Sequence, residues 1–423
     1  DLRDMSWSNL GGTLQNDILK EFHSQNEFIY PPEQSVKLVV DTIEFQSRLV
    51  PKWNSVSISG YHIREAGSSA HQELAFTLRD GMEYVEACVE RGMDIDAFAP
   101  RLSFFFNSHN EFFEEICKLR AARRIWARVM KDRYGAKNER SWFMKTHVQT
   151  AGCSLTEQQP LNNIVRVAYQ AMAAVLGGCQ SLHTDSMDET LGLPTEQAVT
   201  VALRTQQILA HETGATRVTD PLGGSWFVEQ LTDTIEREAI TLIDEIDRMG
   251  DYRGKAPERA DAATPNAQHP AYARREGFGR SVINGINRGY FRRSIAEASY
   301  RFSEECEAGD RIIVGVNAYT DSDDQRPIDI LTIPHEVEVR QVERLAAFEA
   351  KRNKDEVKKA LDNIRAACQG KPVTLRHPMP TAAMHATNVM PALVDGALSH
   401  CTLGEMVQAM ADVYGRYTGG PEW

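Results

Sequence analysis

His62 ends a segment rich in serine and glycine, Ser57-Ile-Ser-Gly-Tyr-His62. An imidazole placed just after a strand can donate a hydrogen bond to a carbonyl group or transfer a proton. A lone histidine in this position is more often a structural residue whose hydrogen bonds are satisfied. Position alone therefore favours the structural interpretation of His62.

A second group of residues has the types needed to hold a flat ligand. Gln149, Gly152 and Glu189 combine an amide, a residue without a side chain and a carboxylate. Glycine at a strand-to-loop turn lets the backbone approach a ligand, and a carboxylate can accept hydrogen bonds from ribose hydroxyls. A tight turn with a helix-capping acid explains the same residues, because Asp188 and Glu189 precede Leu191-Gly-Leu-Pro194. Both interpretations remain open.

A third group could bind a phosphate through cationic and hydroxyl donors. It consists of Arg101, Ser103 and Lys145. Ordinary surface charge is the alternative, and it fits Lys145 better than Arg101. The segment Arg120-Ala-Ala-Arg-Arg124 could also attract phosphates, but its place on an amphipathic helix favours solvation.

Five short β-like segments carry or precede most of these residues. They are Gly12-Thr-Leu-Gln15, Ser55-Val-Ser-Ile-Ser59, Arg101-Leu-Ser-Phe-Phe-Phe106, Met144-Lys-Thr-His-Val-Gln149 and Gln180-Ser-Leu-His-Thr184. Between them, apolar residues recur at helical spacing over 70–91, 110–133, 160–176 and 194–213. This alternation is typical of βα units around a parallel sheet.

The candidate residues gather at or just after the strand ends, where a (β/α)8 barrel builds its active site. They are Gln15, His62, Arg101, Ser103, His147, Gln149 and Glu189. A barrel needs eight strands, so we expect an α/β protein with the five C-terminal units of a TIM barrel and about three N-terminal units missing from this sequence. Three explanations for the missing units remain open. The chain is a fragment, a separate polypeptide supplies the first units, or the fold is an open sheet and not a barrel.

The predicted division of the chain falls near residue 230. Residues 1–230 form the expected barrel part, and residues 231–423 form a mainly helical region with a surface loop at 249–276. Helices are expected at 277–308, 334–369 and 402–415, and a short strand at 312–316. The charged run at 351–359 is assigned to a solvated helix face.

Composition excludes several classes of function. The 423 residues carry a net charge of -12, which argues against a nucleic-acid surface. Seven cysteines are scattered without a Cys-x-x-Cys pair, no apolar run reaches the length of a membrane span, and the first residues lack a signal-peptide pattern. These features predict a cytoplasmic protein. The usual motifs of dinucleotide binding, nucleotide hydrolysis, zinc proteolysis and α/β-hydrolase chemistry are absent.

Six ordered motifs together resemble the methylmalonyl-CoA mutase family. They are Gly12-Thr-Leu-Gln-Asn-Asp-Ile-Leu-Lys-Glu21, Ser57-Ile-Ser-Gly-Tyr-His-Ile-Arg-Glu-Ala-Gly67, Phe98-Ala-Pro-Arg-Leu-Ser-Phe-Phe-Phe106, His147-Val-Gln-Thr-Ala-Gly152, Gln180-Ser-Leu-His-Thr184 and Asp220-Pro-Leu-Gly-Gly-Ser225. The match extends from about residue 11 to the end of the sequence and is weakest at 249–276.

The resemblance implies a barrel through which a CoA thioester threads, capped by adenosylcobalamin on a flavodoxin-like domain. In that family a radical starts the migration of the thioester carbonyl group to the neighbouring carbon. By carry-over, His62 would hydrogen-bond this carbonyl. The cofactor would face Tyr61, His147, Gln149, Gly152, Glu189 and Gly192. The CoA path would be lined by Thr13, Gln15, Asn54, Arg101, Ser103, Lys145 and Gln180.

One departure from the family pattern concerns the acyl group. Gln25 occupies the position where methylmalonyl-CoA mutases place an arginine that pairs with the substrate carboxylate. A neutral amide cannot compensate a buried carboxylate, which costs several kcal/mol when unpaired. We therefore expect an uncharged branched substrate such as isobutyryl-CoA, as in the isobutyryl-, 2-hydroxyisobutyryl- and pivalyl-CoA mutase branch. Methylmalonyl-CoA mutase proper and 2-hydroxyisobutyryl-CoA mutase are the alternatives.

A second departure concerns the cofactor. The family's cobalamin domain carries an Asp-x-His-x-x-Gly loop, and this pattern does not occur here. The ending, with Thr402-Leu-Gly-Glu and Val413-Tyr-Gly-Arg-Tyr, resembles that of a mutase large subunit. We expect a hetero-oligomer in which a small subunit brings adenosylcobalamin and which could contain two large subunits. A non-catalytic mutase-like scaffold and an unrelated barrel lyase or isomerase are competing interpretations.

Overall fold

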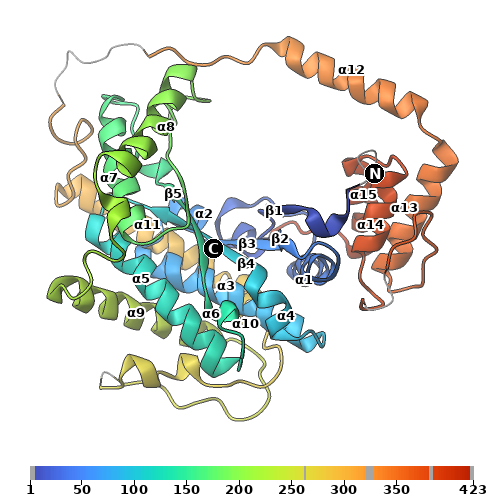
Figure 1. Ribbon diagram of the computed structural model, residues 1–423, viewed down its shortest axis with the longest axis horizontal. Coiled ribbons are helices and arrows are strands. Elements are labelled where there is room, and N and C mark those ends of the chain that lie inside the picture. Colours follow the sequence, from blue (N-terminus) through green and yellow to red (C-terminus); the bar gives the residue numbers. More distant parts are fainter. Residues whose placement is uncertain (1–4, 262, 321–327, 381–383, 420–423) are drawn as a thin grey trace.

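Figure 1 shows the computed structural model, which describes residues 5–261, 263–320, 328–380 and 384–419. The first four residues, part of the segment assessed for a signal peptide, lie outside these ranges. The strands are β1 Gly11–Thr13, β2 Lys52–Asn54, β3 Val56–Ser59, β4 Leu102–Ser108, β5 Lys145–Thr150 and β6 Ser181–His183. β1 pairs with β2, and β3 to β6 pair in sequence order, all in parallel. The five predicted strand regions are therefore confirmed, with Ser55 separating β2 from β3.

The predicted crossover helices are also confirmed. They are α3 Ala70–Glu90, α5 Phe112–Arg128, α7 Asn162–Leu176 and α8 Glu196–His211. Two π-helical turns occur, η2 Glu21–Gln25 before α1 Pro32–Leu49, and η4 Val129–Arg133 after α5. The shorter helices are α2 Tyr61–Glu65, α4 Ile95–Phe98 and α6 Glu139–Trp142. The 3-10 turns are η1 Trp7–Asn9, η3 Ala99–Arg101, η5 Gly152–Ser154, η6 Ala215–Arg217, η7 Asn266–Gln268 and η8 Pro270–Tyr272.

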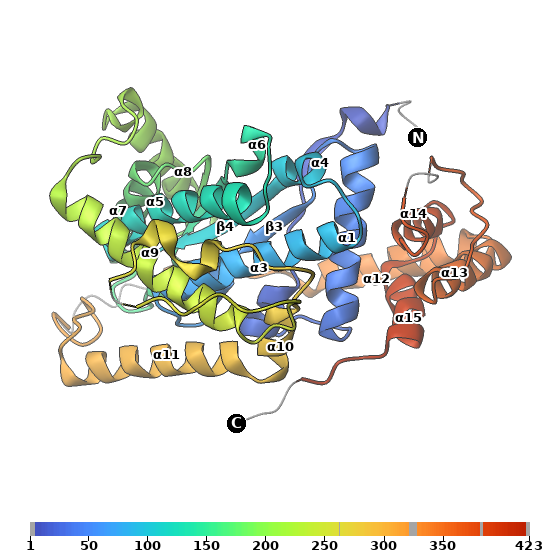
Figure 2. The same cartoon turned by 90° about the horizontal axis from the view of Figure 1, so that it is seen from below.

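The helices that connect the strands cover one face of the sheet (Figures 1 and 2). α1, α3, α5, α7 and α8 pack side by side in this order. The sheet presents fully buried apolar side chains to them, among them Ile58, Phe104 and Val148, and Trp126 of α5 packs edge-on against Phe104 at 4.7 Å between ring centroids. Strands in sequence order with helices on one face distinguish this α/β fold from a doubly wound sheet, whose strand order reverses.

A further helix, α9 Trp226–Asp247, packs across α3 and α5. Its contact with α5 includes a row of three ion pairs, each 2.6 Å long. They join Arg120 to Glu229, Arg124 to Asp233 and Arg128 to Glu236. Arg120 and Arg124 are therefore engaged by α9, and Arg123 donates to Gly177 O after α7, so the arginines at 120–124 are not left free for phosphates. The predicted division of the chain near residue 230 falls inside α9. This division remains a prediction.

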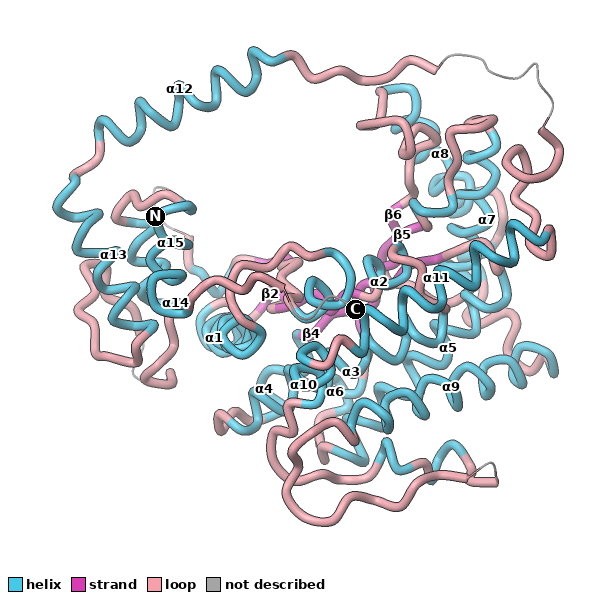
Figure 3. Tube along the Cα trace, turned by 180° about the vertical axis from the view of Figure 1, so that it is seen from behind, coloured by secondary structure: helices cyan, strands magenta, loops and turns pink. Residues whose placement is uncertain are grey.

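The C-terminal part contains α10 Ser281–Asn287, α11 Tyr290–Ala308, α12 His335–Lys351, α13 Lys354–Cys368, α14 Met390–Leu398 and α15 Leu403–Tyr414. Figures 1 and 3 show α12 as an arm between the sheet part and a small bundle formed by α13, α14 and α15. The bundle packs on α1, where Asn388 donates to Glu44 Oε2 at 2.9 Å. None of the α12 side chains is buried.

The strand expected at 312–316 is wrong. Residues 312–316 form a turn with a single bridge between Val314 and Ala318, because Asn317 accepts from Ile313 N–H at 2.7 Å and folds the chain back. The helical structure expected over 334–369 is confirmed as two helices, α12 and α13, which are separated where Asn353 caps α13. The charged run at 351–359 therefore spans two helices, and Val357 within it is buried.

The loop at 249–276 is confirmed as lacking long elements; it contains the turns η7 and η8 and one antiparallel bridge, Arg253 to Glu276. Within the described residues, no helix combines the length and apolarity that a membrane span requires.

Lys118 is a fully buried cation that ties α5 to α3 and to the end of β4. Its Nζ lies 2.6 Å from Glu73 Oε2, donates to Asn107 O at 2.9 Å and pairs with Glu115. Glu73 also accepts from the Asn107 N–H at 2.8 Å. Charge-assisted hydrogen bonds of this kind are short and strong, so they fix the carboxyl end of β4.

We expect Lys118→Met to lower the free energy of unfolding by about 3–5 kcal/mol, because the Glu73 and Glu115 carboxylates stay buried without their cation. Urea unfolding followed by circular dichroism measures the change. Lys359→Met, at an exposed position of α13, is the matched control and should change stability by less than about 0.5 kcal/mol. Equal unfolding midpoints for the two variants would contradict the prediction.

Candidate functional site

The face of the sheet opposite the crossover helices carries three layers of mostly polar side chains. Strand register places Ser57, Ser103 and Lys145 in the layer at the amino ends of the strands. The middle layer holds Ser59, Phe105, His147 and Ser181, and the layer at the carboxyl ends holds Asn107, Gln149 and His183. Alternate residues of a strand point to opposite faces, so the apolar residues between them face the helices. Several of the predicted site residues therefore share one surface.

His62 stands at the end of β3, in the first turn of α2. Its Nδ1 lies 3.0 Å from Ser59 Oγ, and its ring stands edge-on to Phe105 at 5.9 Å between centroids. Burial and the nearby Lys20 ammonium lower the pKa of His62 to about 4. If the Ser59 hydroxyl donates to Nδ1, the neutral imidazole carries its proton on Nε2. His62 can then donate one hydrogen bond to an acceptor above the sheet.

Tyr61 and Gln149 meet beside His62. The Tyr61 ring stacks on Phe105 at 4.9 Å with 6° between planes, and Gln149 Nε2 donates to the Tyr61 oxygen at 2.9 Å. Gln149 Nε2 also donates to Asp185 Oδ1 at 2.7 Å, which fixes the orientation of the amide. Burial raises the pKa of Tyr61 above its ordinary value, with Glu65 acting in the same direction. The hydroxyl therefore stays protonated and able to donate.

Gly152 closes the same cluster from the turn after β5. A Cβ at this position would lie 3.0 Å from Glu65 Oε2, 3.2 Å from the Tyr61 hydroxyl and 3.8 Å from Glu189 Cγ. Glycine thus keeps a space open between two carboxylates and a phenol. Burial raises the pKa of Glu65 to about 7. Hydrogen bonds from the Cys153 N–H and Asn107 Nδ2, both at 2.7 Å, act in the opposite direction and limit this rise. Burial also raises the pKa of Glu189.

His147 and His183 lie on neighbouring strands of this surface. His147 Nδ1 is hydrogen-bonded to Ser181 Oγ, and its ring centroid is 5.0 Å from that of Phe105. Burial lowers the pKa of His147, whereas a hydrogen bond to Asp185 raises the pKa of His183. The cluster contains Glu65, Asp185 and His183 as well as the predicted residues. His183 ends β6, Asp185 follows it, and Glu65 ends the short helix α2 after β3. Position shortly after a strand is the signal that could have identified Asp185 and Glu65.

The amino-terminal layer forms a second polar strip. Asn54 Nδ2 donates to Thr13 Oγ1 at 2.9 Å, and Lys145 Nζ donates to Asn54 Oδ1 at 3.2 Å and to Pro100 O at 2.6 Å. Burial, with Arg101 nearby, lowers the pKa of Lys145. Lys145 is therefore held within the strip by these hydrogen bonds, which the alternative interpretation as ordinary surface charge does not include.

Other predicted residues have structural partners or lie apart. Ser103 Oγ donates to Val56 O at 2.8 Å, and Gln180 Oε1 accepts from the Thr146 N–H, so both side chains support the sheet. Gln15 is exposed, and Gly192 lies in an exposed turn against Ile330. The helix-capping role expected of Asp188 and Glu189 belongs instead to Thr195, whose Oγ1 accepts from the Ala198 N–H at 3.3 Å. Asp188 Oδ2 accepts from the Thr195 N–H at 2.9 Å and so positions the capping residue.

Gln25 lies at the end of η2, which packs against α2. Lys20 Nζ donates to Gln25 Oε1 at 2.6 Å. The segment that carries both is anchored by Asp17, whose Oδ2 accepts from the Ser59 N–H at 2.8 Å. Gln25 and His62 are thus joined through Lys20 and Asp17, two residues that motif reasoning did not single out.

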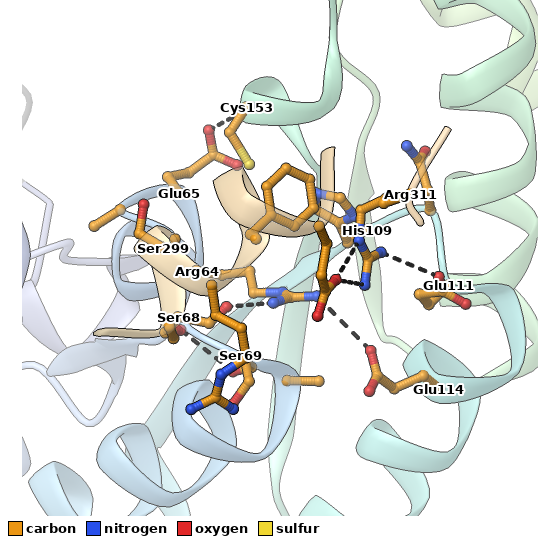
Figure 4. A pocket seen from close by; sticks show the side chains of 18 of the residues that line it. Arg64, Glu65, Ser68, Ser69, His109, Glu111, Glu114, Cys153, Ser299 and Arg311 are labelled. Carbon is orange, nitrogen blue, oxygen red and sulfur yellow. Dashed lines mark hydrogen bonds and ion pairs between the residues drawn. The ribbon is translucent and has the colours of Figure 1, made fainter. Parts of the chain in front are cut away.

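A cavity of about 890 Å³ opens beyond the carboxyl ends of β3, β4 and β5 (Figure 4). Arg64, Glu65, His109 and Cys153 line it from the strand side, and Arg311 lines it from the segment after α11. Burial lowers the pKa of His109 to about 3, so this imidazole is neutral at pH 7. Glu65 belongs to both the cavity wall and the Gly152 cluster, so the two adjoin at this residue.

The His62 pKa has a consequence for pH dependence. A folded-state pKa of about 4, below the usual 6.5, means that folding favours the neutral ring. We expect the stability advantage of the wild type over His62→Gln to be full above pH 6.5 and to be lost as pH falls toward 4. Unfolding at several pH values, with the His62 Cε1–H resonance followed by NMR, measures this. Titration of that resonance near pH 6.5 would contradict the prediction.

Comparison with known proteins agrees with these motifs. The family model described as "Methylmalonyl-CoA mutase" matches residues 2–257 and 276–416. The gap in the match falls within the loop at 249–276, which was the weakest part of the resemblance.

Three relatives illustrate the similarity. "Methylmalonyl-CoA mutase" of Rhizobium meliloti (strain 1021) is 42% identical over 420 residues, covering 99% of this chain and 52% of that protein. "Methylmalonyl-CoA mutase, mitochondrial" of Homo sapiens is 39% identical over 409 residues, covering 96% and 48%. "2-hydroxyisobutanoyl-CoA mutase large subunit" of Aquincola tertiaricarbonis is 36% identical over 419 residues, covering 99% and 67%. The chain spans about half the length of the methylmalonyl-CoA mutases it matches, and it belongs to the methylmalonyl-CoA mutase family.

Proposed function

We propose that this chain is the substrate-handling part of an adenosylcobalamin-dependent acyl-CoA mutase, an isomerase that rearranges the carbon skeleton of a branched acyl-CoA. The observation that carries the proposal is His62, held neutral by burial with Nδ1 engaged by Ser59. Its Nε2–H is available to the carbonyl of the migrating thioester group. A donor fixed in advance costs no reorganisation when the electron distribution of that carbonyl changes.

The space beside Gly152 fits a bulky cofactor. A Cβ there would fill the gap between Glu65, Tyr61 and Glu189, which glycine leaves open. Adenosylcobalamin, when bound, supplies the radical chemistry that removes a hydrogen atom from the acyl group and returns it after rearrangement. Tyr61, Gln149, Gly152 and Glu189 would position it and exclude water, with His147 and Gly192 at the border. We propose that a separate small subunit holds the cofactor.

The polar strip at the amino ends of the strands suits the CoA part of the substrate. Thr13, Asn54 and Lys145 form a hydrogen-bonded row, and Arg101 adds a second cation beside Lys145. These groups would bind phosphate and amide oxygens, with Gln15 at the exposed end. Ser103 and Gln180 would act by supporting this strip, since their side chains bond the sheet backbone.

Gln25 supports an uncharged acyl group, of which isobutyryl-CoA is the simplest example. The nearby ammonium of Lys20 is already balanced by Glu21 at 2.7 Å, so Lys20 and Gln25 leave no spare positive charge for a substrate carboxylate. The relative named a 2-hydroxyisobutanoyl-CoA mutase large subunit supports the same substrate class. Methylmalonyl-CoA is the second candidate substrate, favoured by the relatives named methylmalonyl-CoA mutase.

The same relative's name, "large subunit", supports a hetero-oligomer with a small cobalamin-binding subunit. We propose this assembly, with a division of this chain near residue 230. Free cysteines throughout the described part of the chain support a cytoplasmic location.

We further propose that the sheet is the arc of a (β/α)8 barrel. Its strands follow sequence order, its inner face is layered, and its helices lie on one side, as in such barrels. The residues of β1 are exposed, and those of β6 are exposed or half-buried. Additional βα units would pair with these two edges. The exposed apolar side chains of α12, Val337, Val342, Leu345 and Phe348, would pack on their helices.

A coupled assay tests the function. We expect the purified chain, with its cobalamin-binding partner and adenosylcobalamin, to isomerise isobutyryl-CoA or 2-hydroxyisobutyryl-CoA faster than methylmalonyl-CoA. His62→Ala should lower kcat about 100-fold by removing one donor. Gln25→Arg should shift the preference toward methylmalonyl-CoA by at least about tenfold, because it supplies the missing cation. Absence of mutase activity with all three substrates would refute the proposal.

Hydrogen exchange tests the barrel. Those backbone amides of 11–13 and 181–183 that point away from β2 and β5 should exchange quickly in the isolated chain. They should exchange at least about tenfold more slowly in the active assembly, because new strand pairing protects them. Amides of β4, already paired on both sides, serve as the internal control. Equally fast exchange of both edges in the assembly would show that the sheet remains open.

A further inference from the structure

Lys20 is a buried cation to which the proposed function assigns no direct role. Its side chain is 5% exposed, and its Nζ lies 2.7 Å from Glu21 Oε1 and 2.6 Å from Gln25 Oε1. Burying an ammonium is unfavourable unless partners replace the water it loses. Glu21 supplies the counter-charge, so the contact with the neutral Gln25 needs a separate reason.

The π-turn η2 brings Lys20 and Gln25 together. The Asn26 N–H donates to Glu21 O at 2.9 Å, which is the bond pattern of a π-helix, and Asn26 ends the turn with φ at 66°. In an α-helix, residues five apart point in different directions, whereas the wider π-turn puts them on one face. The local fold therefore aims the ammonium at the amide oxygen.

A fixed oxygen gives the Gln25 amide a defined direction. Within the described residues, Gln25 Nε2 has no hydrogen-bond partner, and the residue is exposed. With Oε1 occupied by Lys20, the free part of the amide is the N–H2 group, which only donates. An oxygen on the branched carbon of an acyl group could accept this hydrogen bond, and a methyl group could not.

We propose that Lys20 is a positioning residue for acyl specificity, which turns the Gln25 amide so that it donates to an oxygen on the acyl branch. This inference rests on the proposed function and narrows its substrate class toward uncharged acyl-CoA thioesters that carry a hydroxyl or carbonyl oxygen. Glu21 balances the charge of Lys20, so the donor is offered without a net positive charge.

Lys20 also acts on His62. η2 packs against α2, and the Lys20 ammonium adds to burial in lowering the pKa of His62. The other groups around the imidazole are the neutral Ser59 hydroxyl and the rings of Phe105 and Tyr61. One cation thus influences both the amide and the imidazole.

Lys20→Met tests the proposal, because it keeps an unbranched apolar stem and removes the charge and the donor. In the assembly with its cobalamin-binding partner, kcat/KM is measured for 2-hydroxyisobutyryl-CoA and for isobutyryl-CoA. We expect the ratio of the first to the second to fall about tenfold in Lys20→Met, the size of one hydrogen bond. Lys20→Arg keeps the charge and the donor, and should hold the ratio within about twofold of the wild type.

A second readout does not need activity. We expect the pKa of His62, followed by NMR of its Cε1–H in the chain, to rise in Lys20→Met and to stay near the wild-type value in Lys20→Arg. An equal loss of activity with both substrates at an unchanged ratio would mean that Lys20 is merely structural and would overturn the proposal, as would an unchanged His62 pKa. A wild-type assembly without mutase activity would instead refute the proposed function, while the His62 pKa would still report on Lys20.

Discussion

The buried carboxylate of Asp17 joins the segments that carry the candidate site. Its Oδ2 accepts from the Ser59 N–H at 2.8 Å, and its Oδ1 accepts from the Tyr84 hydroxyl at 2.6 Å. The Leu19 N–H donates to Asp17 Oδ1 and to the Tyr84 oxygen, each at 3.1 Å. Burial raises the pKa of Asp17, and the hydrogen bonds and Lys20 act in the opposite direction. The end of β3, the core of α3 and the turn that holds Gln25 therefore depend on one carboxylate for their relative positions.

Around this anchor, the sheet separates packing from chemistry by simple alternation. Outward residues such as Phe104 and Val148 are fully buried under helices, whereas the inward residues His147 and Gln149 stay partly accessible. His147 is hydrogen-bonded to Ser181, and Gln149 donates to Tyr61 and Asp185. A rigid apolar layer on one side lets polar groups on the other hold fixed orientations without forming the core themselves. On this polar face, burial raises the pKa values of Tyr61, Glu65 and Glu189, which meet at the carboxyl ends of the strands.

Local patterns predicted the elements better than they predicted the contacts between residues. Strands and crossover helices follow from apolar periodicity. Tyr61, Gln149 and Gly152, which the family motifs single out, lie together in one cluster. Residues 312–316 have strand-like side chains but lack a neighbouring strand, so the turn made by Asn317 prevails. Lys20 and Asp17 were missed because their role depends on a π-turn and on a partner 42 residues away, which helical or strand periodicity does not encode. The hydrogen bonds of Lys145 to Asn54 and Pro100 could likewise not be derived from its residue type alone.

The arginine row between α5 and α9 has a consequence for how the two helices find their alignment. The arginines recur every four residues, and the acidic residues opposite them recur at intervals of four and three. Sliding α9 by one turn would therefore give two of the three arginines a new acidic partner, so charge alone discriminates poorly between neighbouring alignments. Discrimination must come from groups that do not repeat, such as Val228, whose side chain is buried and whose carbonyl accepts from Cys117 Sγ at 3.4 Å. The ion pairs can speed the approach of the helices, and the apolar contacts select the correct setting.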